Sequence, residues 1–199
     1  MRPEKPCGAA DEEAGRRGLL AGRQIFLTGF MATGKTKIGC LLARRLDRLF
    51  VDTDALIVEA AGKTVAEIFE QDGEAAFRRV EHNCVVRASQ MPDAVIALGG
   101  GAITQEANWE VIRETGVCVC LRASPETIFE RVSRTEGERP LMAGLDDAGR
   151  LARIREMLTE REAYYSRADL FVTSSEDGPP EKTAEAAIAA LRKRENTTA

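Results

Sequence analysis

The residues best suited to chemistry begin with a glycine-rich loop, GFMATGKT, which spans Gly29 to Thr36. It matches the pattern G-x-x-x-x-G-K-[ST] in full, with a short apolar run before it and a helical pattern after it. In such a loop successive backbone N–H groups point at phosphate oxygens, aided by the N-terminus of the helix. Lys35 would reach the β- and γ-phosphates, and the Thr36 hydroxyl would ligate Mg²⁺. The loop therefore predicts a nucleoside triphosphate and leaves the phosphate acceptor open.

An acidic pair follows the second apolar run, in FVDTDALI. Asp52 and Asp54 are two residues apart at the end of a predicted strand, so both side chains project to one side. Ligands of open α/β sheets lie outside the carboxyl ends of the strands. One carboxylate there can orient water on Mg²⁺, and the other can accept a hydroxyl proton during phosphoryl transfer. The alternative is that Thr53 or Asp54 caps the next helix, which would explain one acidic residue and not both.

Two further groups could bind a small anionic acceptor. GEAAFRRVEH carries Arg78 and Arg79 at the start of a predicted helix. Arginine binds carboxylates bidentately, although paired arginines on a helix more often form a solvated face. Three glycines, Gly99 to Gly101, directly follow a buried apolar run. A tight turn needs one or two glycines, and three suit a place where a ligand touches the backbone.

The elements that position these groups alternate between strands and helices. Five short apolar runs predict strands: QIFLT (24–28), LFVDT (49–53), AVIALG (94–99), VCVCL (117–121) and LFVT (170–173). Between them, Thr64 and Glu67 form a capping box, and Ser124-Pro125 begins another helix. The alternation predicts an α/β domain with a parallel sheet covered on both faces. The loop-like segment 135–149 is a candidate lid over a phosphate site.

Length and composition favour one domain that binds small molecules. The chain has 199 residues, of which 44% are hydrophobic and 30% charged, with a net charge of −4. That balance suits a globular domain, and no dense basic stretch indicates a nucleic-acid partner. No apolar run has the length of a membrane span. We expect a flexible extension over residues 1–22, a single domain over 23–192 and a C-terminal tail over 193–199.

The five cysteines show no C-x-x-C spacing, which favours reduced thiols, a cytoplasmic location and no cysteine-based metal site. Cys118 and Cys120 alternate within VCVCL and are expected to share one face of a strand. The single histidine, His82, lies in a charged helical stretch and is expected to have a structural role.

Taken together, the motifs resemble those of the shikimate kinases. GFMATGKT, DTDALI, IFEQDGEAAFRRVE, LGGGAIT, ERP and EREAYY occur in the order and at the spacing of that family, over about residues 23–192. The resemblance implies a three-layer P-loop fold, similar to the nucleoside monophosphate kinases, with a five-stranded parallel sheet, helices on both faces and a mobile lid. It also implies transfer of the γ-phosphate of ATP to the 3-hydroxyl of shikimate, a step toward chorismate and the aromatic amino acids. A monomer is expected.

The resemblance assigns a role to each matching residue. Asp54 would bind the shikimate hydroxyls and act as base or hydroxyl-orienting group, while Lys35 and Arg139 would stabilise the transferred charge. Arg78 and Arg161 would hold the shikimate carboxylate, and Gly100 and Gly101, supported by Gly99, would contact shikimate through the backbone. Thr36 would ligate Mg²⁺ and Asp52 would position it through water. The residues expected to contact ATP are Gly29, Ala32, Thr33, Gly34, Lys35, Thr36, Lys37, Arg134 and Arg139.

One position departs from the family pattern. Ala32 stands where the family loop usually has glycine, and its methyl group is tolerable if φ is negative there and costly if φ is positive. Two alternatives to a shikimate kinase remain. A related kinase could act on another polyol acid such as gluconate, although Arg78, Arg161 and the triple glycine favour shikimate. A non-catalytic nucleotide-binding module would predict loss of Lys35, Asp54 or Arg139, and all three are present.

Overall fold

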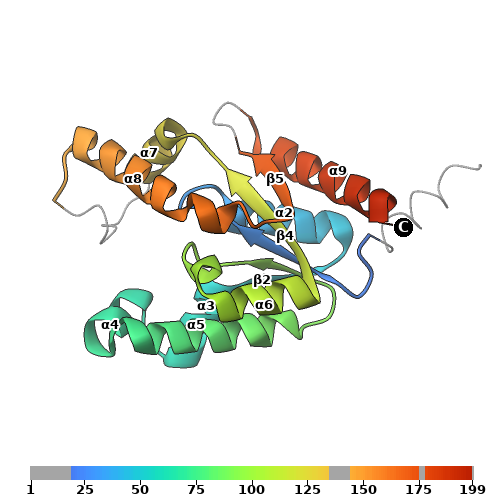
Figure 1. Cartoon of the computed structure of the whole chain (residues 1–199), viewed down its shortest axis with the longest axis horizontal. Helices are drawn as coiled ribbons and strands as arrows, with labels where there is room; N and C mark the ends of the chain where they lie inside the picture. The colour runs from blue at the N-terminus through green and yellow to red at the C-terminus, as the bar shows by residue number, and fades with distance from the viewer. Residues whose placement is uncertain (1–18, 135–143, 175–177, 199) are drawn as a thin grey trace, which may run out of the picture.

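The computed structural model describes residues 19–134, 144–174 and 178–198, and its centre is a five-stranded parallel sheet (Figure 1). The strands are β1 (Gln24–Thr28), β2 (Leu49–Asp52), β3 (Ala94–Ala97), β4 (Gly116–Arg122) and β5 (Leu170–Thr173). Their order is β2-β3-β1-β4-β5, and Ile25 of the central β1 pairs with Val95 and Val117. All five predicted strands are confirmed. Because β1 is central, the glycine loop after it opens in the middle of the carboxyl edge.

Helices connect the strands and cover both faces of the sheet. Those described are α2 (Lys35–Leu46), α3 (Thr53–Ala61), α4 (Val65–Gln71), α5 (Gly73–Ser89), α6 (Glu106–Thr115), α7 (Pro125–Ser133), α8 (Asp147–Tyr165) and α9 (Pro180–Thr198), with a short 3₁₀ helix over Ala102–Thr104. The predicted capping box is present, since the Thr64 hydroxyl accepts from the Glu67 N–H and the Glu67 carboxylate accepts from the Thr64 N–H. Ser124 caps α7 through the Thr127 N–H. Local sequence thus sets these helix starts.

Two apolar layers hold the helices on the sheet. On one face Ile25, Leu27 and the valines of β3 and β4 pack against α2 and α9. On the other, Phe26 and Ile96 pack with side chains of α3, α5, α6 and α8. Cys118 and Cys120 both lie in this second layer, as expected from their alternation. The predicted α/β fold, with a parallel sheet between two helical layers, is therefore confirmed.

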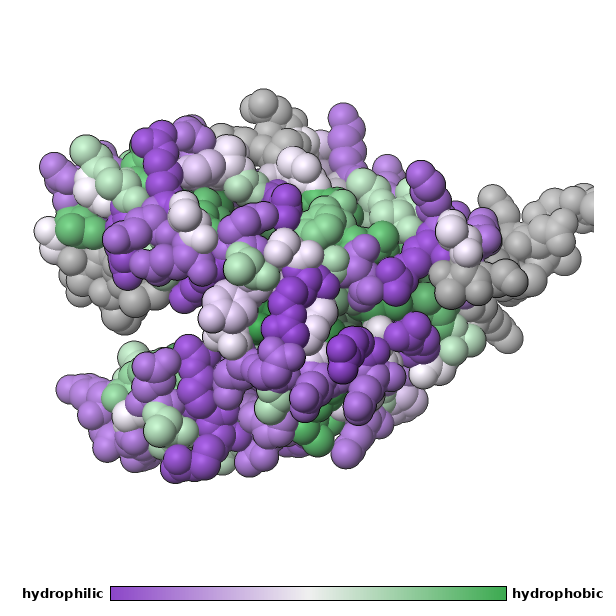
Figure 2. All heavy atoms as spheres, viewed as in Figure 1, coloured by the Kyte–Doolittle hydropathy of each residue, from purple (hydrophilic) through white to green (hydrophobic). Residues whose placement is uncertain are grey.

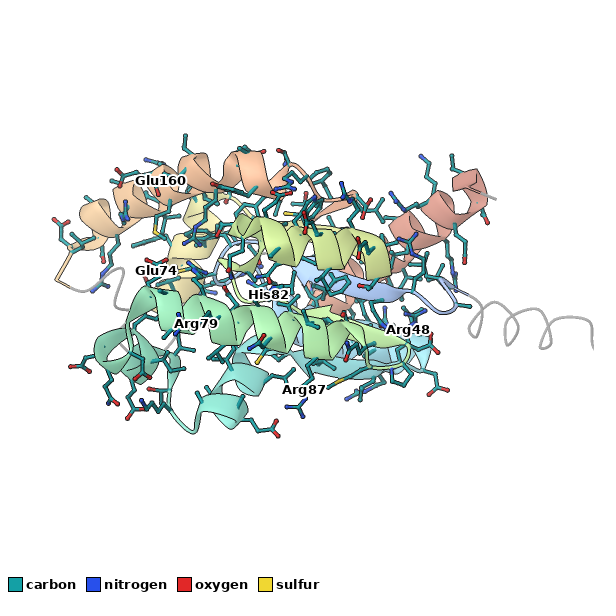
Figure 3. All side chains as sticks on the ribbon, turned by 60° about the horizontal axis from the view of Figure 1, so that its bottom comes forward. Arg48, Glu74, Arg79, His82, Arg87 and Glu160 are labelled. Atoms are coloured by element: carbon teal, nitrogen blue, oxygen red, sulfur yellow. The ribbon has the colours of Figure 1, made fainter. Side chains whose placement is uncertain are left out.

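The amino edge of the sheet is tied to both ends of the described chain. Leu19 and Leu20 are buried, although the sequence places them in a flexible extension. Arg48 donates to the carbonyls of Leu19, Leu20 and Arg23, and the Glu195 carboxylate accepts from the Leu20 N–H. α9 also continues to Thr198, through most of the expected tail. Figure 3 shows Arg48 at the end of the molecule opposite Glu74. In the described ranges, no helix is long and apolar enough to cross a membrane.

Candidate active site

The glycine loop is held in shape by its own side chains. Lys35 Nζ donates to the carbonyls of Gly29 and Phe30 at 2.9 and 3.1 Å. The buried Thr33 hydroxyl donates to the Phe30 carbonyl at 2.8 Å. Gly29 has φ 139°, and a Cβ there would collide with the Leu121 carbonyl. Gly29 and Thr33 therefore fix the backbone of the loop, and Lys35 is the first residue of α2.

Ala32 occupies the conformation that the sequence marks as costly. Its φ is 58°, in the left-handed region where glycine is favoured. The Ala32 carbonyl accepts a hydrogen bond from Arg131 Nη1 at 3.1 Å. Tertiary contact thus holds a strained residue at the tip of the loop.

Thr36 and the acidic pair meet beside the loop. The Thr36 hydroxyl donates to Asp52 Oδ2 at 2.8 Å, and Asp52 Oδ1 accepts from the Asp54 N–H at 3.0 Å. Asp52 is therefore the N-cap of α3. From the sequence, Thr53 or Asp54 is the candidate for that role. The Asp54 carboxylate is open to the cavity but flanked by protein. Loss of hydration raises its pKa, the negative charge of Asp52 raises it further, and Lys35 partly opposes both.

These groups line one cavity of about 670 Å³. Figure 2 shows the molecule hollowed between the part that carries α7 and α8 and the part that carries α4 and α5. The predicted residues that line the cavity are Ala32, Gly34, Lys35, Thr36, Lys37, Asp52, Asp54, Arg78, Gly99, Gly100, Gly101 and Arg161. The structure therefore brings the phosphate loop, the carboxylates and both arginines to one place. Val65, Phe69 and Phe77 add an apolar wall that the sequence analysis does not identify.

Arg78 is positioned by two carboxylates on its own helix. Its Nη1 donates to Glu81 Oε2 at 2.8 Å and its Nη2 to Glu74 Oε1 at 3.1 Å. Burial lowers the pKa of Arg78, but the bonds and charges of Glu81 and Glu74 outweigh burial and raise it. Glu81 is 1% exposed and also accepts from Gln105 Nε2 at 2.7 Å. Sequence reasoning misses Glu81, whose signal is its place three residues after Arg78 on α5. Arg79 is exposed on the same helix (Figure 3).

The three glycines differ in how much room their surroundings leave for a Cβ atom. A Cβ on Gly99 would lie 2.6 Å from Asp54 Oδ1, and one on Gly101 would lie 3.1 Å from Arg78 Nη1. A Cβ on Gly100 would have its nearest neighbour at 3.8 Å. The Gly99 N–H donates to the Thr53 hydroxyl at 2.9 Å, which ties this loop to the acidic segment. Gly99 and Gly101 therefore leave room for the side chains of Asp54 and Arg78.

A second cavity of about 340 Å³ adjoins the glycine loop. It is lined by Ala32, Gly34, Lys37, Ile38, Arg131, Ser174, Gly178, Pro180 and Thr183. Arg131 donates to the Ser174 hydroxyl at 3.0 Å. The sequence analysis expects Arg134 to contact ATP, but Arg134 is 71% exposed, pairs with Glu130 and does not line either of these two cavities. Arg139 and most of the candidate lid lie outside the described residues.

His82 has the structural contact expected of it. Its Nδ1 lies 2.8 Å from Asn108 Oδ1, which joins α5 to α6. Within the described part of the chain, no three His, Cys, Asp or Glu side chains cluster as a metal site.

Comparison with known proteins agrees with this geometry. The shikimate kinase family model matches residues 31–192. A shikimate kinase of Caldanaerobacter subterraneus is 44% identical over 171 residues, which cover 86% of this chain and 97% of the relative. One from a Synechococcus species is 42% identical and covers 89% of this chain and 86% of the relative.

Solved structures give the same result. A shikimate kinase from Bacteroides thetaiotaomicron matches with a TM-score of 0.81 at 32% identity, covering 85% of this chain and 98% of the other. The Acinetobacter baumannii enzyme in complex with shikimate matches at 0.78 and 31%, covering 86% and 94%. A gluconokinase from Sinorhizobium meliloti reaches only 0.57 at 17% identity and shares the fold alone. From its motifs, its fold and these matches, the chain belongs to the shikimate kinase family.

Proposed function

We propose that this protein transfers the γ-phosphate of ATP to the 3-hydroxyl of shikimate. The observation that carries the proposal is one cavity in which the phosphate loop faces Asp54 and the two arginines, Arg78 and Arg161. Shikimate is a small polyol with one carboxylate, so it needs a hydroxyl acceptor and a carboxylate clamp in the same place. Both kinds of group line this cavity next to the expected site of the γ-phosphate.

The loop residues supply the phosphate site. Lys35, now on the Gly29 and Phe30 carbonyls, would exchange those bonds for β- and γ-phosphate oxygens. Thr36 and Asp52 already pair through oxygen atoms at 2.8 Å, and hard oxygen donors suit Mg²⁺. When bound, Mg²⁺ would neutralise charge on the phosphates. Thr36 would ligate it directly, and Asp52 would hold a water of its shell.

Asp54 would act on the acceptor hydroxyl. Its raised pKa makes it a better proton acceptor than an ordinary aspartate. Arg78 would bind the acceptor carboxylate from α5 and Arg161 from α8, which fixes the ring between two elements. Catalysis would then rest on positioning and on electrostatic stabilisation of the moving phosphoryl group by Lys35, with Arg139 as the lid contribution.

The second cavity is the proposed site of the adenine ring. It adjoins the glycine loop at Ala32, Gly34 and Lys37, and Arg131 lines it with a planar guanidinium suited to stacking on a base. We assign this contact to Arg131 rather than Arg134. The gluconokinase match, at 17% identity, supports the fold alone and gives no support to gluconate as the acceptor.

We further propose a cytoplasmic monomer. The four described cysteines are free, as expected in a reducing compartment. The exposed large hydrophobic side chains include Leu49 and Phe171 on the two edge strands, far apart across the sheet, and so do not form one dimer-sized patch.

The test is a coupled assay of ADP release with ATP and Mg²⁺ across shikimate, gluconate and nucleoside monophosphates. We expect turnover with shikimate that depends on Mg²⁺, and background rates with the others. Faster turnover with gluconate, or no turnover with shikimate under conditions where ATP binds, would refute the proposed function.

A further inference from the structure

The hydroxyl of Tyr165 contacts the backbone of the triple glycine. Tyr165 is 3% exposed and ends α8, and its hydroxyl donates to the Gly100 carbonyl at 2.9 Å. Arg161 precedes it by one helical turn and donates from Nη1 to the same carbonyl at 3.4 Å. The Arg161 guanidinium also lies over the Phe30 ring, 5.6 Å from its centroid.

The phenol of Tyr165 has one proton, and it is donated to the Gly100 carbonyl. A phenol has one donor and two acceptor lone pairs, so donation to Gly100 leaves the oxygen free to accept from Arg161. Burial raises the pKa of Tyr165, while the charge of Arg161 and its hydrogen bond to the phenol lower it in part. The phenol therefore keeps its proton at neutral pH and donates it to the Gly100 carbonyl, the same oxygen that Arg161 Nη1 contacts.

Fixing the Gly100 carbonyl also fixes the next N–H group. The peptide between Gly100 and Gly101 is planar and trans, so its C=O and its N–H point in opposite directions. Neither glycine has a side chain whose packing could fix the orientation of that peptide plane, and the glycine backbone is permissive. The bond from Tyr165 supplies an orientation that these two residues cannot set themselves.

Resting on the proposed function, we propose that Tyr165 is a positioning residue for the acceptor carboxylate. Its hydroxyl orients the Arg161 guanidinium and the Gly100–Gly101 peptide together, so that a charged donor and a backbone donor converge on one ligand. Tyr165 does not touch the reacting phosphate. Its removal should therefore weaken binding of shikimate and leave binding of ATP unchanged.

The test is Tyr165→Phe, which keeps the ring and removes the hydroxyl. We expect KM for shikimate to rise about 2- to 10-fold, the effect of one lost hydrogen bond, with KM for ATP within about 2-fold. Tyr164→Phe is the matched control, because Tyr164 is the adjacent tyrosine and is 37% exposed. Melting temperatures are measured for both, and kinetics are run well below the lower value.

A double-mutant cycle with Arg161→Gln separates positioning from packing. If Tyr165 acts through Arg161, Tyr165→Phe should raise KM for shikimate less in the Arg161→Gln background than in the wild type. Unchanged kinetics in Tyr165→Phe, equal rises in both Michaelis constants, full additivity in the cycle or an insoluble variant would each overturn the proposal. If the wild-type protein, assayed alongside the variants, is inactive on shikimate, that result refutes the proposed function rather than the role of Tyr165.

Discussion

Replacing Ala32 by glycine should stabilise the protein. Ala32 holds φ at 58°, and its carbonyl is fixed there by Arg131, so the loop cannot relax by changing the backbone. Ala32→Gly removes only the methyl group and keeps the hydrogen bond from Arg131 to the backbone carbonyl. The change therefore isolates the cost of a Cβ in the left-handed region.

The size of the effect follows from two opposing terms. A left-handed conformation costs an L-residue about 1–2 kcal/mol. Glycine gives back about 0.4–1 kcal/mol, because it has more freedom in the unfolded chain. Subtracting the centres of these ranges leaves about 0.8 kcal/mol of added stability. For a chain of this size that raises Tm by about 2–3 °C.

Thermal unfolding without nucleotide is the assay, and the control is Ala189→Gly. Ala189 is exposed within α9, where glycine should cost about 0.5–1 kcal/mol and lower Tm. The two substitutions are chemically identical and are expected to have opposite signs. An equal fall of Tm in both variants would refute the strain argument. KM for ATP in Ala32→Gly then reports whether the strained loop affects nucleotide binding.

The remaining predictions concern the cavity. Asp54→Asn should lower kcat by about 10²- to 10⁴-fold while ATP still binds by calorimetry, and near-normal turnover would remove Asp54 as base. Burial and the charge of Asp52 raise the pKa of Asp54, so the acidic limb of the kcat/KM profile should lie at a pH above 3.8, the ordinary pKa of aspartate. Asp52→Asn removes one of these causes and should shift the acidic limb to lower pH. Arg78→Ala should raise KM for shikimate by about 10- to 100-fold, with the exposed Arg79→Ala nearly silent. Arg131→Ala should raise KM for ATP, and an unchanged KM would contradict the assignment of the adenine contact to Arg131.

The sequence predicts the fold because its local signals agree with the global arrangement. The inner strands of a parallel sheet are buried on both faces, and each of the five runs has at least three consecutive apolar residues. The capping box at Thr64 and the Ser124-Pro125 start needed no tertiary information, and both are present.

The parts of the site that sequence analysis misses depend on tertiary contacts. Glu81 is one of two acidic residues on α5, both within reach of Arg78, and its burial and its contact with Gln105 distinguish it from Glu74. The sequence analysis names Arg134 and not Arg131, and only the folded structure shows that Arg131 lines the second cavity while Arg134 is 71% exposed. The usual glycine of the family raises the question of φ at Ala32, and only the folded loop answers it, with φ at 58°.

The triple glycine also limits how this protein can evolve. Every amino acid that a single-base change of a glycine codon can encode adds a Cβ. At Gly99 that atom would meet the Asp54 carboxylate, and at Gly101 it would crowd the Arg78 guanidinium, so both positions are closed unless a functional side chain moves. Gly100 is sterically open to alanine. Among three adjacent and identical residues, only Gly100 has room for a Cβ beside the protein's own atoms.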